Sequence, residues 1–404
     1  MGLAARFQQA RLLLASDRNA ARQKLQSIIR DAPGDSSSVA AMLLLADLAI
    51  DEHNDTLARH ELLDIAIRFP SSAHTPKALF QAAIISYVLG MFRRAAVELD
   101  SLALLYPRSD ETTAALYWSG RAWKEAHGPV EARRHWKAVQ ARDPISYYSV
   151  LAGRRLGSVP WTPRPSVDVF LRVPAAEIAI LRAEMLERFG LHIEAELEYD
   201  LLASIARGSP AAQLTVMHLL GARDQSWRVL ALLRTSPDDW PSSDARYYRL
   251  VYPEPFRDVV VESSRANHLD AELVFAVIRQ ESSFNPRATS TAGARGLMQV
   301  EPTVGRMLMT NTGTLPWNAD LLYQPEVNVL LGARHLRHFQ QRYVDRPHRL
   351  AAYNAGESRV SRWDQRLGAS DSELFVERIP FAETRDYVRV VERNRAMYHI
   401  LYGR

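Results

Sequence analysis

The sequence contains no cysteine, which excludes disulfides, metal sites built on thiolates and lipid attachment at a cysteine. Lysine is scarce as well, because only four of the 50 basic residues are lysine and the others are arginine. No apolar run approaches the roughly 18 residues that a membrane-spanning helix requires. The formal net charge of +4 is too small for a chain of 404 residues to indicate nucleic-acid binding. We therefore expect neither a transmembrane segment nor a nucleic-acid partner.

Apolar residues make up 47% of the chain, which is ample for a sizeable core, and the length predicts two or three domains. The first residues offer a single short apolar block, at positions 12–15, and no small-residue cleavage site. They are therefore a poor secretion signal.

The first part of the chain repeats with a period of 37 residues. Several small or apolar residues recur at this interval, and they form four series. The series are Pro33, Pro70, Pro107 and Pro144; Ala21, Ala58, Ala95 and Ala132; Leu25, Leu62, Leu99 and Trp136; and Ala41, Ala78 and Ala115. We interpret each unit as two amphipathic helices and a turn containing proline, in which alanine allows the helices to approach closely. The pattern predicts a stacked helical superhelix over residues 1–157.

Aromatic residues are frequent at the end of this array, and two interpretations are open. The residues are Tyr117, Trp118, Trp123, Trp136, Tyr147 and Tyr148. They could form a surface on which carbohydrate stacks, or they could fill the core between repeats. We favour the core, because they occur at helical spacing beside alanine and leucine.

A second part is predicted over residues 158–245. Four prolines between residues 157 and 174 exclude regular structure and mark a boundary. Helical periodicity then returns in four stretches, at residues 175–189, 193–205, 211–220 and 227–233. These stretches contain no constellation of catalytic residues, so we interpret them as a further helical layer. The pattern breaks again at residues 238–243, and a third part is expected over residues 246–404.

One carboxylate in the third part has an unusual position. Residues 273–278 are apolar on every side, which predicts a buried helix, and Pro286 disfavours its continuation. Glu281 should lie at the end of this helix, partly desolvated and near the negative end of the helix dipole. Both effects raise the pKa of a carboxyl group, as a general acid at neutral pH requires. The alternative is that Glu281 is merely the first solvated residue after a core helix.

Four strings in the third part occur in a specific order. They are RQESSFNP at 279–286, GARGLMQ at 293–299, AYNAG at 352–356 and IPFAETR at 379–385. Together they resemble the catalytic domain of the soluble lytic transglycosylases, bacterial enzymes with a goose-type lysozyme-like fold that cleave peptidoglycan. The resemblance implies a mainly all-α protein, with a helical-repeat superhelix followed by a lysozyme-like catalytic domain.

The resemblance also implies a reaction and a set of residues. In this family one Glu protonates the glycosidic oxygen between N-acetylmuramic acid (MurNAc) and N-acetylglucosamine (GlcNAc). The same carboxylate then deprotonates the C6 hydroxyl of MurNAc, which closes on C1 to leave a 1,6-anhydro sugar without consuming water. Glu281 matches that residue. Gln299 and Ser290 would bond acetamido or hydroxyl groups, Tyr353 would hold the sugar or stabilise charge near Glu281, and Glu383 would bond the substrate.

Two alternatives stay open at this point. Many relatives carry a hydrophobic pair after GLMQ, whereas here Val300 is followed by Glu301. If Glu301 faces the cleft, it could position a water, and the enzyme would be a muramidase that hydrolyses the bond with a second carboxylate, Glu301 or Glu383. If Glu301 only begins the helix before Pro302, this argument fails, and we favour that interpretation. The second alternative is a helical-repeat scaffold whose lysozyme-like part only binds glycan.

Other chemistries find little support in the sequence. Ser282 and Ser283 lack the Gly-x-Ser-x-Gly pattern of a serine hydrolase, and His335 and His338 lack the HExxH pattern of a zinc site. We expect no metal and no cofactor. The expected partners are peptidoglycan glycan strands, with proteins of cell-wall synthesis or remodelling as further candidates. A periplasmic location follows from the substrate alone.

Overall fold

The structure is a computed structural model, and it describes residues 2–14, 16–164, 167–233, 244–310, 317–367 and 371–403. These residues form helices and a few isolated β-bridges, so the predicted mainly all-α class is confirmed. The chain packs as two compact units. The first unit comprises Met1–Trp161 and Arg362–Phe381, and the second comprises Thr162–Ser361 and Ala382–Arg404.

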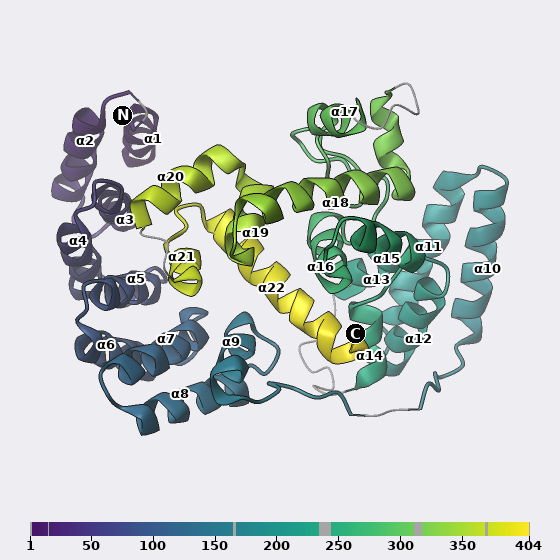
Figure 1. Cartoon of the computed structure of the whole chain (residues 1–404), viewed down its shortest axis with the longest axis horizontal. Coiled ribbons are helices and arrows are strands. Elements are labelled where there is room, and N and C mark those ends of the chain that lie inside the picture. The colour runs from purple at the N-terminus through teal and green to yellow at the C-terminus, as the bar shows by residue number, and fades with distance from the viewer. Residues whose placement is uncertain are drawn as a thin grey trace. The chain divides into compact units, whose positions relative to one another are not determined.

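Helices of the first unit follow one another as stacked pairs (Figure 1). They are α1 (Leu3–Leu13), α2 (Arg18–Asp31), α3 (Ser36–Asp51), α4 (Asp55–Arg68), α5 (Thr75–Val88), α6 (Phe92–Leu105), α7 (Glu111–Glu125), α8 (Pro129–Arg142) and α9 (Tyr147–Leu156). The alanine series that begins at Ala21 lies on α2, α4, α6 and α8, and the series that begins at Ala41 lies on α3, α5 and α7. Every member of both series is buried, which confirms the predicted helical repeat.

A further series with the same period closes the turns. Its members are the buried hydroxyl residues Ser38, Thr75, Thr112 and Ser149. Each hydroxyl donates a hydrogen bond of 2.5–2.7 Å to the backbone carbonyl six residues earlier, at the end of the preceding helix. Carbonyls at a helix end lack a partner within the helix, so these bonds satisfy them and fix each turn. Serine and threonine both occur in this series, so no single residue type marks its period in the sequence.

The aromatic residues at the end of the array form core, as we favoured. Tyr117 and Trp118 are fully buried, and Trp136, Tyr147 and Tyr148 are at most 8% exposed. Several of the rings meet edge to face; the centroids of Tyr117 and Trp118, for example, lie 5.9 Å apart. These five rings are therefore not available as a stacking surface for carbohydrate, whereas Trp123 is only partly buried and packs against this core.

A segment from near the C-terminus completes the first unit. Helix α20 (Glu357–Leu367) leads into the first unit, and α21 (Ser372–Arg378) follows. We call residues 371–378 the returning segment. Its polar contacts with the repeats include Asp371 with Arg121 at 2.6 Å, Glu373 with Arg121 at 2.7 Å, Glu373 with Tyr117 at 2.6 Å, Glu373 with Arg155 at 2.9 Å, Glu377 with Tyr148 at 2.9 Å, and Arg378 with Asp55 at 2.8 Å. The division into residues 1–157, 158–245 and 246–404 stays a prediction, and the packing differs from it in this segment.

The second unit contains the other helices. They are α10 (Pro174–Arg188), α11 (His192–Ala206), α12 (Pro210–Gly221), α13 (Ser226–Leu233), α14 (Ala245–Val251), α15 (Arg257–Ala266), α16 (Ala271–Ser282), α17 (Pro302–Thr310), the 3₁₀ helix η1 (Ala319–Tyr323), α18 (Pro325–Arg342), α19 (Arg346–Ala355) and α22 (Ala382–Tyr402). The four helices predicted between residues 175 and 233 are confirmed. The predicted break at residues 238–243 lies outside the described residues.

Helix α16 forms the centre of the second unit. Its residues 273–278 are all buried, as predicted, and the helix packs against α22. The ring of Phe275 stacks on Tyr398 of α22 with centroids 5.5 Å apart, and Tyr387 and Val391 of α22 are also buried. None of the helices in the described ranges is both long and apolar enough to cross a membrane.

Candidate active site

The end of α16 fixes the position of Glu281. At the other end of the helix, the carboxylate of Asp270 accepts a hydrogen bond of 2.9 Å from the backbone N–H of Glu272. The helix stops at Ser282, because Ser283 and Phe284 adopt left-handed backbone conformations with φ of 51° and 67°. Phe284 is fully buried, which anchors this turn in the core. Glu281 therefore lies in the last turn, as the sequence predicts.

Two tyrosines surround the carboxyl group of Glu281. The hydroxyl of Tyr387 donates a hydrogen bond of 2.7 Å to Oε1 of Glu281. Burial raises the pKa of Glu281 to about 7, and the bond from Tyr387 opposes this shift. Burial and the nearby charge of Glu281 hold the pKa values of Tyr353 and Tyr387 well above their ordinary range. The carboxyl group of Glu281 can thus carry a proton near neutral pH, while the hydroxyls of Tyr353 and Tyr387 remain protonated.

The loop of residues 295–299 is held by a buried amide on α18. Asn328 is fully buried, and its Oδ1 accepts a hydrogen bond of 2.7 Å from the backbone N–H of Met298. Its Nδ2 donates to the carbonyls of Arg295 and Leu322, each at 2.8 Å. One side chain thus bonds three backbone groups, of which the carbonyl of Arg295 also accepts a hydrogen bond of 3.1 Å from the N–H of Val300.

Side chains of α16 and α19 hold the same loop from other directions. The hydroxyl of Tyr353 donates to the carbonyl of Met298 at 2.8 Å. The hydroxyl of Ser282, next to Glu281, donates to the carbonyl of Leu297 at 2.8 Å. The loop is therefore fixed with respect to Glu281 by hydrogen bonds from three helices.

Gly296 has a structural role in this loop. Its φ of +74° favours glycine, and a Cβ atom there would lie 2.1 Å from the carbonyl oxygen of Leu322 and 2.3 Å from Nδ2 of Asn328. Close packing against Asn328 and Leu322 therefore explains the glycine at this position.

Gln299 and Ser290, predicted to bind the sugar, both bond the loop itself. Nε2 of Gln299 donates to the carbonyls of Gly296 at 2.9 Å and Ala288 at 3.2 Å. Oγ of Ser290 accepts a bond of 3.1 Å from the backbone N–H of Ala294. These bonds shape the loop beside Glu281, and the roles of the two residues in sugar binding stay predictions.

The other two carboxylates lie at helix starts. Glu383 is exposed in the first turn of α22, where its neighbour Thr384 donates a bond of 2.7 Å to Oδ1 of Asn354 on α19. Glu301 is exposed directly before α17, and its carbonyl accepts a bond of 2.8 Å from Gly305 in the first turn. The prediction that Glu301 begins the helix at Pro302 is therefore confirmed.

Sequence reasoning missed two residues of this site. One is Tyr387, which follows Glu383 by four positions and shares its face of α22. Asn328 was overlooked in the string PEVNVLLGARHL. A polar side chain within an apolar helical stretch signals a buried hydrogen-bonding role, and that signal was available in the sequence.

Replacing Asn328 by Ala should lower the free energy of unfolding by about 2 kcal/mol, because the N–H of Met298 and the carbonyl of Leu322 lose their side-chain partner. Denaturant unfolding followed by circular dichroism measures the effect. Gln341→Ala is the control, since this exposed residue lies on the same helix and should change little. Equal stabilities of the two variants would contradict the role assigned to Asn328.

Comparisons with known proteins agree with this fold. The family model described as transglycosylase SLT domain matches residues 258–376. The soluble lytic murein transglycosylase of Salmonella typhimurium is 28% identical over 311 residues, which cover 75% of this chain and 46% of the relative. A putative soluble lytic murein transglycosylase of Haemophilus influenzae is 35% identical over 161 residues, 39% of this chain and 27% of the relative. The chain thus spans less than half the length of these curated relatives.

Solved structures extend the likeness in fold to almost the whole chain. Lytic transglycosylase Slt from Pseudomonas aeruginosa, solved as an inactive mutant, has a TM-score of 0.75 and 22% identity, covering 96% of this chain and 62% of that one. The 70-kDa soluble lytic transglycosylase in complex with bulgecin A has a TM-score of 0.73 and 22% identity, covering 100% of this chain and 62% of that one. Fold and site together define a protein with a helical superhelix and a lysozyme-like domain. The matching domain, the curated relatives and the solved structures support the soluble lytic transglycosylase family that the sequence motifs indicate.

Proposed function

We propose that this protein is a peptidoglycan lytic transglycosylase that cleaves the β-1,4 bond between MurNAc and GlcNAc. The observation that carries the proposal is the carboxyl group of Glu281, whose pKa burial raises to about 7 beside the neutral hydroxyl of Tyr387. Named relatives support the substrate, since they are murein transglycosylases. The inactive mutant of the Pseudomonas enzyme carries glutamine in place of a glutamate.

Glu281 would act twice in the reaction. Its protonated carboxyl gives a proton to the glycosidic oxygen as the bond from C1 of MurNAc to that oxygen breaks, which leaves positive charge at C1. The resulting carboxylate then takes the proton of the C6 hydroxyl, whose oxygen closes on C1. Glu281 ends protonated again, and no water is consumed. The hydroxyl of Tyr387 stabilises the carboxylate between the two steps through its bond to Oε1.

The other residues of the site would bind the sugar. The side-chain oxygen of Gln299 would accept a hydrogen bond from an acetamido N–H while its Nε2 remains bonded to the loop. Ser290 would bond acetamido or hydroxyl groups, and Glu383 would bond the substrate from the start of α22. Tyr353 would hold the sugar or stabilise charge near Glu281, because its ring is buried beside that carboxylate.

The exposure of Glu301 and Glu383 supports this reaction over hydrolysis. A hydrolase that inverts or retains configuration uses a second carboxylate beside the acid. Glu301 and Glu383 are both exposed residues at helix starts, and two tyrosines surround Glu281. A substrate of this kind also implies a periplasmic location and partners among proteins of cell-wall synthesis or remodelling.

Mass spectrometry of the soluble products from purified peptidoglycan tests the proposal. A transglycosylase releases anhydro-muropeptides, and a muramidase releases products heavier by one water. The anhydro form is expected from the wild-type protein. Reducing-end products would establish hydrolysis instead, and the absence of any product would favour a glycan-binding scaffold.

Tyr387→Phe should move the pH dependence of cleavage upward. Glu281 must be protonated to start the reaction, so the rate of the wild type should fall as the pH rises through about 7. The bond from Tyr387 lowers the pKa of Glu281, so its removal raises that pKa, and the fall in rate should occur at higher pH. Rate profiles between pH 5 and 9 measure the shift, with Tyr343→Phe as the control. An unchanged profile would contradict the coupling of Tyr387 to Glu281.

A further inference from the structure

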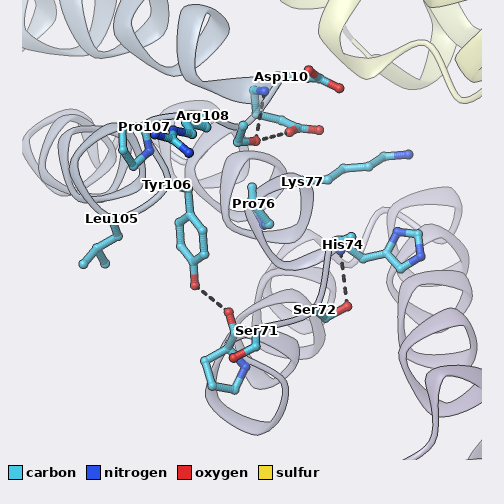
Figure 2. A pocket seen from close by; sticks show the side chains of 14 residues that line it. Ser71, Ser72, His74, Pro76, Lys77, Leu105, Tyr106, Pro107, Arg108 and Asp110 are labelled. Carbon is cyan, nitrogen blue, oxygen red and sulfur yellow. Dashed lines mark hydrogen bonds between the residues drawn. The ribbon is translucent and has the colours of Figure 1, made fainter.

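A cavity of about 590 Å³ lies in the first unit, between the turn that joins α4 to α5 and the turn that joins α6 to α7 (Figure 2). Its lining residues are Pro70, Ser71, Ser72, Ala73, His74, Pro76, Lys77, Leu105, Tyr106, Pro107, Arg108, Ser109, Asp110 and Glu111. The volume falls within the range of about 300–1,000 Å³ that is common for small-ligand sites. The candidate active site uses none of these residues.

Equivalent turns of two successive repeats build this cavity. Thr75 and Thr112 close the two turns through their bonds to the ends of the preceding helices. The hydroxyl of Tyr106 donates a bond of 3.0 Å to the carbonyl of Pro70, which connects one turn to the other, as Figure 2 shows. The walls are thus fixed by the repeat scaffold before any ligand binds, which lowers the entropic cost of binding.

Two cations of the lining depart from the repeat. Lys77 is one of only four lysines in the chain. At the positions that correspond to Lys77 and Arg108 by the 37-residue period, the other repeats carry Ala40, Ala114 and Leu151, and Gly34, Ser71 and Ile145. The scaffold therefore folds without a cation at either position. The two charges need another explanation, and a ligand of opposite charge provides one.

The lining carries both signs of charge. Lys77 and Arg108 supply positive charge, and Asp110 and Glu111 supply negative charge, with Ser109 donating a bond of 2.6 Å to Glu111. Tyr106 is the single aromatic residue among the lining residues, and its hydroxyl is already bonded to Pro70. A neutral sugar usually binds on aromatic faces, whereas a lining with balanced charges suits a ligand that has both a carboxylate and an amine.

We propose that this cavity binds the short peptide that peptidoglycan carries on its glycan strands, an inference that rests on the proposed function. Lys77 and Arg108 bind carboxylates of the peptide, and Asp110 binds a free amine, while the serine hydroxyls and the turn backbone contact its amide groups. The repeat unit thereby recognises the peptide part of the substrate whose glycan part is cleaved at Glu281.

Isothermal titration of the full chain tests this inference with two probes. One is the mixture of peptides that an amidase releases from purified peptidoglycan, and the other is a peptide-free oligomer of N-acetylglucosamine. In the double variant Lys77→Ala and Arg108→Ser, each residue takes the identity found in a neighbouring repeat, which protects the fold. Arg133→Ser with Lys137→Ala is the control, because it removes the same charge from exposed positions on α8.

The peptides should bind the wild type and the control equally, and the double variant at least about tenfold more weakly. Asp110→Asn should weaken binding of the peptides but not of peptides whose amines have been acetylated. The inference is overturned if the wild type binds no peptide, if the double variant binds as tightly as the control, or if it loses affinity only for the sugar oligomer. Titration requires no cleavage, so failure of the proposed reaction would be seen separately in the product analysis.

Discussion

Glu281→Gln is expected to slow the release of soluble products from peptidoglycan by at least about a thousand-fold, since general acid–base catalysis contributes on the order of 10²–10⁴ and here one residue acts in both steps. Glutamine has the shape of glutamate and can still accept the hydrogen bond from Tyr387 at Oε1. It has no proton to give to the glycosidic oxygen and cannot take one from the C6 hydroxyl. The variant should therefore bind peptidoglycan as the wild type does while failing to cleave it.

Cosedimentation with insoluble peptidoglycan separates binding from cleavage in this experiment. Glu301→Gln is the matched control, because it makes the same chemical change at an exposed carboxylate before α17. It should keep the wild-type rate. Lysis by Glu281→Gln at the wild-type rate would refute the assignment of the acid, and an equal loss in Glu301→Gln would favour hydrolysis.

Arg121→Met is expected to lower the free energy of unfolding by about 3 kcal/mol, because it leaves the carboxylate of Asp371 without its arginine and removes one of the two arginines that pair with Glu373. Arg121 is 7% exposed, and it also donates a bond of 2.9 Å to the hydroxyl of Tyr87. Its side chain lies over the ring of Trp118, 4.9 Å from the centroid. Burial alone would raise the pKa of Asp371, but the bonds from Arg121 hold it below the ordinary value.

Denaturant unfolding at neutral pH measures this loss of stability. Arg155→Met is a suitable comparison, because Arg155 also pairs with Glu373 but its side chain is 30% exposed, so its removal should cost less. Adding Asp371→Leu to Arg121→Met should restore part of the lost stability, since Glu373 keeps Arg155 as its partner and the carboxylate left without an ion pair is gone. A loss below about 1 kcal/mol in Arg121→Met would show that the ion pairs of Arg121 stabilise the protein no more than surface ion pairs do.

The sequence was sufficient to predict the helical repeat and the helix that carries Glu281. The alanines and leucines of the repeat recur at one interval because each helix contacts its neighbour in the same way. The residues of each repeat therefore indicate how it packs on the next. The apolar run at residues 273–278 predicts a buried helix for a similar reason. Pro286 then limits how far that helix can extend, which places Glu281 at its end.

Contacts between residues far apart in the sequence could not be predicted in this way. Tyr387 lies 106 residues from Glu281, and no period relates the two. The family match at residues 258–376 includes most of the returning segment, although that segment packs with the first unit. The sequence shows the polar residues of this segment but not their partners, because charged residues on a short helix are equally compatible with a solvated surface.

The returning segment also has a consequence for how the protein is made. Asp371 follows Arg121 by 250 residues in the sequence. The repeats are therefore synthesised before the carboxylate that pairs with the Arg121 guanidinium. Translation must continue through the helices around Glu281 before that partner exists. The repeats therefore gain this contact only when the chain is nearly complete. A transcript broken in between would yield repeats in which Arg121 lacks the carboxylate of Asp371.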